Sequence, residues 1–503
     1  MSAQARRALI CLSLGNLWFL PVWAELLPSA IGGRNLYYFA ALPPRIHYWL
    51  LPISVVLLAA IFFGVSSALK RSAFTEAVFL LLLVIPLNGI RIQIDALALG
   101  SLVRVFGKAG LLGAGLAGLA LGVWLLLKRR ESLVRAVLGA LTMAAAFVPV
   151  TFGQSLWNAA TWEAPHDPSG YLVKDADAPA PSRRMLWLLF DEADYELIFE
   201  HRSPNISLPA IDALAARAVQ LTNAAAPGPA TAYSIPAYTS GREVLSAMPV
   251  ARDRMLLQFA GAEDYVPWSQ VPTLFEMLHD QGARVGVEGW HHPYCRQFAA
   301  QLSYCRDHLS PPLLDGRGMG AWEMQWQRLL QSFPLVYRLG GGILEDSRLR
   351  KTELESIHEG ALALAADPSI DFVWVHYPVP HLPGIWDAGA DRYVLDRQGS
   401  YEDNLELMDR ALGEVLATLD RSDLAGITDV IVTSDHQFRT KKNDDRRVPL
   451  LIRFAGEERG ARFDGALNAR VAHDLVLERF AGKITDVSSL LDWLGERADY
   501  SGR

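Results

Sequence analysis

Acidic side chains and histidines follow three apolar segments of this sequence, at the points where the segments end. These side chains are Asp191, Glu192, His376, His381, Asp435 and His436. In a further stretch, 227-PGPATAYSIP-236, Gly and Pro break the chain and Thr231 is the first hydroxyl residue. Turns favour such residues in any case, but a hydroxyl group is also a nucleophile when a base or a metal activates it. Carboxylates and imidazoles bind zinc and other divalent metals. The sequence therefore predicts a metal site if the fold gathers these groups.

The apolar segments have the pattern of buried strands. They cover residues 185–190, 284–289, 371–376, 429–434 and 448–453, and helical patterns lie between them at 207–219, 272–282 and 401–420. Continuous apolar strands separated by amphipathic helices predict a mostly parallel sheet that is covered on both faces. Side chains that follow parallel strands meet at one edge of such a sheet. We expect one α/β domain over residues 183–503, with the polar groups gathered at that edge.

The first third of the chain has a different composition. Residues 1–155 carry 13 Lys and Arg but only 4 Asp and Glu, whereas the rest of the 503-residue chain carries 34 and 50. An apolar run that spans a bilayer needs roughly 20 residues, and the runs of that length are 8–28, 49–69, 75–93, 109–127 and 134–153. The four later runs argue that the first is an anchor rather than a cleaved signal peptide. We expect a five-span membrane domain over 1–153 and a linker over 154–182.

Clustered positive charges predict how the membrane domain is oriented. Arg6 and Arg7 precede the first run, Lys70 and Arg71 separate the second from the third, and 128-KRR-130 separates the fourth from the fifth. All three clusters fall on one side if the N-terminus is cytoplasmic. The C-terminal domain then lies outside the bacterial inner membrane, in the periplasm. That domain has no basic stripe, which argues against a nucleic-acid partner.

The cysteines agree with an outer location. Cys295 and Cys305 lie close together in the sequence, and in an oxidising compartment they predict a disulfide. Two free buried thiols are the alternative. His291 and His292 precede this pair and either pack around the disulfide or contact a substrate.

Seven segments resemble the alkaline phosphatase/sulfatase superfamily. Within it the sequence is most similar to membrane-anchored phosphoethanolamine transferases and, more distantly, to lipoteichoic acid synthases. The segments are 186-LWLLFDEAD-194, 209-PAIDALAARAVQLTNAAA-226, 231-TAYSIPAYTSG-241, 377-YPVPHLP-383, 401-YEDNLELMDRALG-413, 430-VIVTSDH-436 and 447-RVPLLIRFAG-456. The resemblance includes the five-span anchor, and it implies an alkaline-phosphatase-like α/β fold for the C-terminal domain.

The resemblance also implies roles for individual residues. One divalent metal, zinc or alternatively manganese, would be held by Asp191, Thr231, Asp435 and His436. Thr231 would be the nucleophile, and His381 would hold a phosphate oxygen or protonate the leaving group. Residues that support the site or contact the substrate would be Glu192, His376, Arg439 and Lys441. We expect Thr231 at a surface turn, with Ser234 at the start of the following helix and Pro236 in its first turn.

Transfer through a phospho-threonine is the function that the resemblance favours. A phospholipid in the bilayer would pass its phospho-head-group, of the phosphoethanolamine or phosphoglycerol type, to Thr231 and then to an envelope lipid or glycan. Sulfatases carry Cys or Ser in a Cys/Ser-x-Pro-Ser-Arg motif that is oxidised to formylglycine, and no such motif lies near Thr231. Two alternatives stay open. One is a membrane-tethered hydrolase or phosphodiesterase that uses water as acceptor, and the other is a non-catalytic envelope scaffold.

Overall fold

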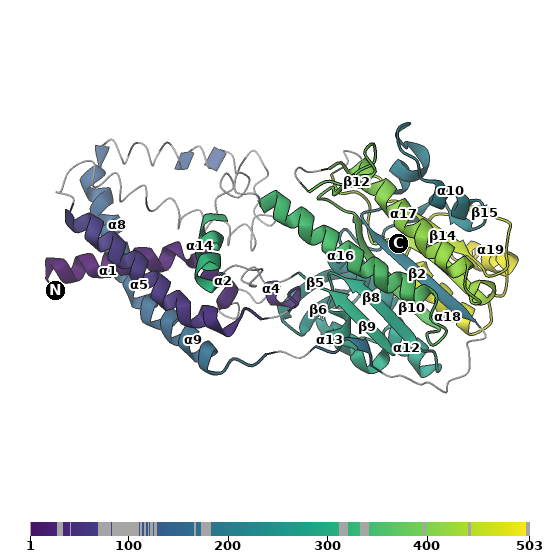
Figure 1. Ribbon diagram of the computed structural model, residues 1–503, viewed down its shortest axis with the longest axis horizontal. Coiled ribbons are helices and arrows are strands. Elements are labelled where there is room, and N and C mark those ends of the chain that lie inside the picture. The colour runs from purple at the N-terminus through teal and green to yellow at the C-terminus, as the bar shows by residue number, and fades with distance from the viewer. Residues whose placement is uncertain are drawn as a thin grey trace. The chain divides into compact units, whose positions relative to one another are not determined.

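The structure is a computed structural model that divides into two compact units (Figure 1). Apart from isolated residues between 82 and 124, it describes residues 2–27, 34–40, 42–68, 128–164, 167–172, 183–310, 320–331, 342–395, 399–440 and 444–498. The first unit contains residues 1–32, 41–165 and 311–342, and the second contains 33–40, 166–310 and 343–503. Residues 33–40 therefore belong to the second unit, although the residues on both sides of them in sequence belong to the first. Conversely, residues 311–342 belong to the first unit, although the residues on both sides of them belong to the second.

The first unit is helical. Its elements are α1 (Ala3–Trp18), α2 (Leu20–Leu26), α5 (Arg45–Ala68), α8 (Arg130–Ala144), η1 (Ala145–Phe147), α9 (Val148–Ala160) and α14 (Ala321–Gln331). Residues 154–160, for which the sequence predicted a linker, are the last turns of α9. A buried cluster that includes Leu14, Trp23 and Leu51 holds these helices together.

Some of these helices are long and apolar enough to cross a membrane. Arg45–Ala68 and Glu131–Ala160 pass this test singly, and α1 with α2 passes it as one span that is bent by 60°. They coincide with the predicted runs 49–69, 134–153 and 8–28. The other two predicted runs, 75–93 and 109–127, lie outside the described residues except at isolated positions. The described part of the chain thus provides two to three candidate spans that would anchor the protein in a membrane.

Helix α14 packs within the helical unit although it lies far along the chain. Gln325 accepts a hydrogen bond from Ser54 Oγ at 2.7 Å and donates one to the backbone oxygen of His47 at 3.0 Å. Arg328 lies 3.5 Å from the carboxylate of Glu25. Because these contacts join residues about three hundred positions apart, the periodicity of the sequence did not predict them.

The second unit contains a nine-stranded sheet with the order β1-β9-β8-β10-β2-β13-β14-β3-β15. Its strands are β1 (Gly170–Tyr171), β2 (Arg184–Asp191), β3 (Val219–Leu221), β8 (Val285–Trp290), β9 (Tyr304–His308), β10 (Phe372–Pro380), β13 (Thr428–Ser434), β14 (Leu450–Arg453) and β15 (Ala461–Phe463). The run from β9 to β13 is parallel throughout, whereas β1 and β14 pair antiparallel with their neighbours. All five predicted strands are present, and the prediction of a mostly parallel sheet is confirmed.

Helices cover both faces of this sheet, as predicted. All eight residues of β2 are buried, and they alternate between two cores. Leu188 packs on the side of α10 (Pro209–Ala215), α16 (Gly342–Ala365) and α17 (Tyr401–Asp420). Trp187 packs on the side of α11 (Thr231–Ser240), α12 (Leu274–Asp280), α18 (Val471–Phe480) and α19 (Val487–Gly495). Since β2 is central and dry on both faces, the polar groups at its end lie deep in the domain.

Shorter elements complete the second unit. They are α4 (Arg34–Tyr37), η2 (Glu196–Glu200), β4 (Ala224–Ala225), β5 (Val244–Ala251), β6 (Arg254–Phe259), β7 (Val266–Pro267), η3 (Trp268–Gln270), α13 (Tyr294–Phe298), η4 (Ala299–Gln301), β11 (Trp386–Asp387), β12 (Arg392–Tyr393), η5 (Ala425–Ile427) and β16 (Leu467–Asn468). The strands β5, β6 and β7 form a separate small sheet.

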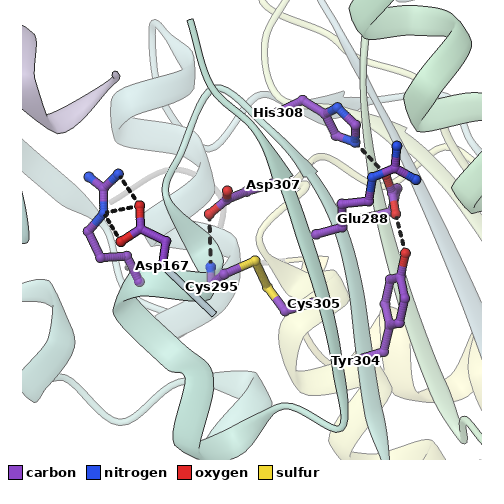
Figure 2. The surroundings of a disulfide bond; sticks show 9 residues. Asp167, Glu288, Cys295, Tyr304, Cys305, Asp307 and His308 are labelled. Atoms are coloured by element: carbon purple, nitrogen blue, oxygen red, sulfur yellow. Dashed lines mark hydrogen bonds and ion pairs between the residues drawn. A yellow bond between two sulfur atoms is a disulfide. The ribbon is translucent and has the colours of Figure 1, made fainter. Parts of the chain in front are cut away.

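The predicted disulfide is present between Cys295 of α13 and Cys305 of β9 (Figure 2). The Cα atoms of the two residues lie 5.5 Å apart, and the bond ties α13 to the strand that follows it. The backbone N–H of Cys295 donates to Asp307 Oδ2 at 3.1 Å in the same region (Figure 2). A covalent link and a hydrogen bond thus both hold the loop that follows β8.

Candidate active site

The sheet brings two predicted site segments to neighbouring strand ends. Strand β2 lies between β10 and β13, and Ser434 of β13 pairs in parallel register with Phe190 of β2. Asp435 and Asp191 are the next residues on these two strands. The predicted site residues therefore do meet at one edge of the sheet. This edge lies at the carboxyl end of β2, which is the central strand.

Asp191, Asp435 and His436 form a compact buried group, which we call the Asp–Asp–His cluster. Their potential ligand atoms all lie within 4.8 Å of one another. His436 Nε2 is 3.4 Å from Asp191 Oδ1 and 3.4 Å from Asp435 Oδ2. Both carboxylate oxygens of Asp191, Asp435 Oδ2 and His436 Nε2 are buried and have no hydrogen-bond partner. Burying such groups without a partner is costly. The three residues therefore fit a divalent cation, which would satisfy all of these atoms.

Neighbouring backbone groups orient the cluster. Asp435 Oδ1 accepts hydrogen bonds from the backbone N–H of Glu192 at 3.1 Å and of His436 at 2.7 Å, which leaves Oδ2 to face the cluster. His436 Nδ1 lies 2.9 Å from the backbone oxygen of Gln437. Since Nδ1 must carry the proton to make that bond, the lone pair of Nε2 points at the carboxylates. This arrangement of outer partners is typical of metal ligands.

The two carboxylates differ in their pKa values. Burial, together with the charges of Asp435 and Glu192, raises the pKa of Asp191 well above its usual range. Burial also acts to raise the pKa of Asp435, but His436, His376 and the nearby Thr231 hydroxyl outweigh it and lower that pKa. Two carboxylates this close do not both ionise easily without a cation between them.

Thr231 lies next to this cluster, as the first residue of α11. It is buried rather than at a surface turn, with 8 % of its surface exposed, and its hydroxyl acts to lower the pKa of Asp435. Because the helix begins at Thr231, Ser234 and Pro236 lie inside it and not at its start, so that prediction is wrong. Gly228 explains the early start: a Cβ atom there would lie 2.6 Å from the Cβ of Tyr233, so only glycine lets the loop fold back onto the first turn. The amino end of a helix also favours a bound anion beside Thr231.

Glu192, His381 and Arg439 form a connected group beside the cluster. Arg439 Nε lies 2.6 Å from Glu192 Oε1, and Arg439 Nη2 donates to His381 Nε2 at 2.8 Å. His381 Nδ1 contacts the backbone oxygen of Leu382, and burial lowers the pKa of His381. Glu192 has a left-handed backbone with φ 67°, which is strained for a residue with a side chain. Lys441, which the sequence placed with this group, lies outside the described residues.

His376 is fully buried at this edge of the sheet. Its Nδ1 lies 3.1 Å from the hydroxyl of Tyr294, and its Nε2 has no hydrogen-bond partner. Burial lowers the pKa of His376 to about 4, so the ring is neutral near pH 7. A neutral, unpartnered Nε2 close to Asp435 can accept a hydrogen bond from a substrate.

The histidines that follow β8 also reach this edge. His292 Nε2 lies 3.3 Å from the backbone oxygen of Thr231, and burial lowers the pKa of His292 to about 3. His291 has φ 68°, and its ring stacks on Tyr38 with centroids 4.4 Å apart. Tyr37 is fully buried nearby, with its ring 6.0 Å from that of His292. Nothing in the sequence predicted that two tyrosines between the first two apolar runs would pack beside the site.

The sulfatase family model matches residues 185–495 of this chain. The chain belongs to the sulfatase family. The match runs from β2 to α19 and includes Asp191, Thr231, Asp435 and His436.

Three solved structures to which the chain is similar are distant from it in sequence. A sulfatase from Pseudoalteromonas sp. is 16% identical, with coverage of 60% of this chain and 68% of that chain and a TM-score of 0.40. A phosphonate monoester hydrolase of Agrobacterium radiobacter is 13% identical, with coverage of 59% and 74% and a TM-score of 0.37. An alkaline phosphatase superfamily protein from Vibrio parahaemolyticus is 14% identical, with coverage of 62% and 68% and a TM-score of 0.38. A search of curated proteins finds no match.

The sulfatase domain also has a cleft of 440 Å³ away from these residues. It is lined by Leu354, Glu355, His358, Trp386, Asp391, Arg392, Tyr393, Leu407, Arg410, Ala411 and Glu414. Its charged groups pair with one another: Arg410 lies 2.8 Å from Asp391, and His358 lies 2.9 Å from Glu414.

Proposed function

We propose that this protein transfers a phospho-head-group, of the phosphoethanolamine or phosphoglycerol type, from a membrane phospholipid to an envelope lipid or glycan. The group would be carried as a phosphate ester of Thr231. The observation that supports this most strongly is the hydroxyl of Thr231 beside Asp435, at the amino end of α11. A threonine in this position cannot become the formylglycine of sulfatases, which favours phosphoryl transfer over sulfate-ester hydrolysis.

Asp191, Asp435 and His436 would hold the metal that the family implies, with Thr231 as a further oxygen ligand. A bound divalent cation would lower the pKa of the Thr231 hydroxyl and screen the negative charge of the phosphate. Zinc suits such a ligand set, and manganese is the alternative.

In the first step the Thr231 oxygen forms a bond to phosphorus while the bond between phosphorus and the diacylglycerol oxygen breaks. Asp435, whose pKa the nearby Thr231 hydroxyl acts to lower, would take the hydroxyl proton, and the released lipid oxygen gains a proton. His381 could supply that proton only after its Nε2 is protonated and Arg439 no longer donates to it. In the second step a hydroxyl of the acceptor attacks phosphorus, loses its proton and restores the Thr231 hydroxyl.

The chain order supports a donor that lies in the bilayer. Residues 34–40 follow the first apolar run directly and belong to the catalytic unit. The catalytic domain and the loop between the first two runs would then share one side of the membrane, in agreement with a cytoplasmic N-terminus. A site held on that side would meet lipid head groups.

The test uses the full chain in lipid nanodiscs with labelled phosphatidylethanolamine or phosphatidylglycerol. Diacylglycerol release that depends on an added envelope-lipid acceptor supports transfer, whereas equal release in water alone supports the hydrolase alternative. Mass spectrometry of the peptide with Thr231 should show the added phospho-head-group when the acceptor is withheld. Release without this modification would rule out a phospho-threonine.

A further inference from the structure

Arg350 of α16 is a half-buried cation without an acidic partner. Its guanidinium carbon lies 4.5 Å from the centroid of the Trp290 ring. Nη1 donates a weak hydrogen bond to the backbone oxygen of Pro378 at 3.4 Å, and Nε is buried with no partner. Among the described residues Arg350 makes no ion pair, whereas Arg439 nearby is paired with Glu192 at 2.6 Å.

Trp290 places this guanidinium at the candidate active site. The Trp290 ring lies 5.6 Å from the ring of His376 and 6.2 Å from that of His381, centroid to centroid. Arg350 therefore flanks the same group of side chains that surrounds the Asp–Asp–His cluster, although it comes from the opposite layer of the domain to Thr231. It approaches the site from α16, whereas Thr231 approaches from α11.

The charge of Arg350 acts on the residues of the site. It lowers the pKa of Asp191 against the raising effect of burial. It also adds to burial in lowering the pKa values of His291 and His381. These effects place the positive charge within electrostatic range of the cluster.

The buried Nε of Arg350 has no hydrogen-bond partner, and burying a donor without a partner is costly. Stacking on an indole ring offsets part of the desolvation cost, but it supplies no hydrogen-bond acceptor for Nε. The fork of N–H donors on a guanidinium matches the paired oxygens of phosphate and carboxylate groups.

We propose that Arg350 binds an oxygen of the substrate's tetrahedral phosphate group, and that α16 thereby selects phosphate-bearing substrates for the site. This inference rests on the proposed function, since it assumes that a phosphate group is presented to Thr231. Trp290 holds the guanidinium in place through its ring. Arg350 is therefore a substrate-binding residue that the family motifs in this sequence did not indicate.

The experiment measures equilibrium binding of inorganic phosphate to the full chain in detergent, by calorimetry, with metal content determined on each sample. Arg350→Gln should weaken phosphate binding by roughly tenfold to a hundredfold, the range expected for a charge-assisted hydrogen bond. Arg350→Lys keeps the charge but loses the fork, and its affinity should lie between the two. The matched control is Arg348→Gln, an exposed arginine on the same helix, which should bind phosphate like the unaltered protein.

The outcomes separate this inference from the proposed function. Unchanged phosphate binding by Arg350→Gln overturns it, as does failure of the unaltered protein to bind phosphate. If Arg350→Gln does not fold, Arg350→Lys decides, because an affinity equal to that of the unaltered protein then counts against the role of the fork. The Thr231→Ala variant should keep the dependence on Arg350. If no phosphate is found on Thr231, this result would therefore contradict the proposed function, but it would not change the conclusion drawn from phosphate binding by the Arg350 variants.

Discussion

Two buried aspartates lie side by side where β2 and β13 end, and the hydroxyl of Thr231 acts on the pKa of Asp435. Both oxygens of Asp191 and Oδ2 of Asp435 have no hydrogen-bond partner within the protein, so the contribution of each residue to activity depends on the others. Removing one should cost more than the contact that it makes, because groups that act as a unit are not additive. Single substitutions in this cluster should therefore have large effects on activity, and they test the role of each residue directly.

Thr231→Ala should reduce diacylglycerol release by roughly a thousandfold or more, as expected when a nucleophile is removed. Its effect on folding should be small, since it removes a single hydroxyl group, a change worth about 1 kcal/mol. Thermal unfolding and the release assay on the same sample check both points. Thr231→Ser, which keeps a hydroxyl, should retain part of the activity. Near-normal turnover in the alanine variant would show that another group attacks phosphorus.

Asp435→Asn should sharply reduce the metal content of the purified protein, because it removes one of the two carboxylate charges that offset a divalent cation. Inductively coupled plasma mass spectrometry measures this directly. Asp423→Asn changes an exposed acid that follows α17 and should leave the metal content unchanged. Full metal occupancy in Asp435→Asn would contradict the ligand assignment.

Strands β8 and β9 and helix α13 form a tightly linked element beside the site (Figure 2). Buried Glu288 of β8 accepts a hydrogen bond from Tyr304 at 3.0 Å and contacts His308 on β9. Asp307 on β9 accepts from the backbone N–H of Cys295. The turn that carries His291 and His292 is thus held on both sides by polar contacts and the disulfide.

Asp307 should make the stability of this element depend on pH. Burial raises its pKa from 3.8 to about 6 in the folded protein. The folded state therefore binds a proton more tightly than the unfolded state, and stability falls as pH rises from about 4 to about 6. Asp307→Asn should stabilise the protein by roughly 2–3 kcal/mol near pH 8, with no gain near pH 4.

Thermal unfolding of the full chain in detergent across this pH range measures the effect. Asp253→Asn alters an exposed acid in the turn between β5 and β6 and should show no such pH-dependent gain. A gain in Asp307→Asn that is equal at both ends of the range would show that folding does not raise the pKa of Asp307.

The whole molecule joins helices that fit a membrane to a sulfatase domain, and the chain passes between the two units more than once. Residues 34–40 contribute Tyr38 to the surroundings of His291, and residues 320–331 contribute α14 to the helical unit. The two units are therefore interlaced in sequence, so we expect neither to fold normally when it is cut out at a single boundary.

The orientation of the protein in the membrane can be tested by cysteine labelling of the full chain in spheroplasts. Glu163→Cys places a thiol at an exposed position after α9, and Ser2→Cys places one at the exposed N-terminus. A membrane-impermeant maleimide should label the first and not the second if the catalytic domain is periplasmic. The unaltered protein provides the background, since its one free cysteine, Cys11, is buried. Labelling at Ser2→Cys alone would reverse the proposed topology.

The sequence by itself determined the order of the elements and the chemical types at the strand ends. Short continuous apolar runs that are rich in β-branched and aromatic residues favour buried strands over helices, so β2, β8, β10, β13 and β14 were all predictable, as was the covered, mostly parallel sheet. Asp191, Asp435 and His436 were predictable for the same reason, because parallel strands end at one edge. The helix that starts at Thr231 was misread, since the close packing of Gly228 on Tyr233 is invisible in a list of residues.

Only the tertiary structure decided which distant groups meet. Arg350, Tyr38 and His291 come from a helix, a loop and a strand end with no common spacing, and their meeting depends on how the layers pack on the sheet. Periodicity reports which side of an element is buried, but it carries no information about the partner that buries it. The cluster of two aspartates and one histidine could therefore be predicted from the sequence. The positions of Arg350 and of the aromatic rings near the cluster could be known only from the folded chain.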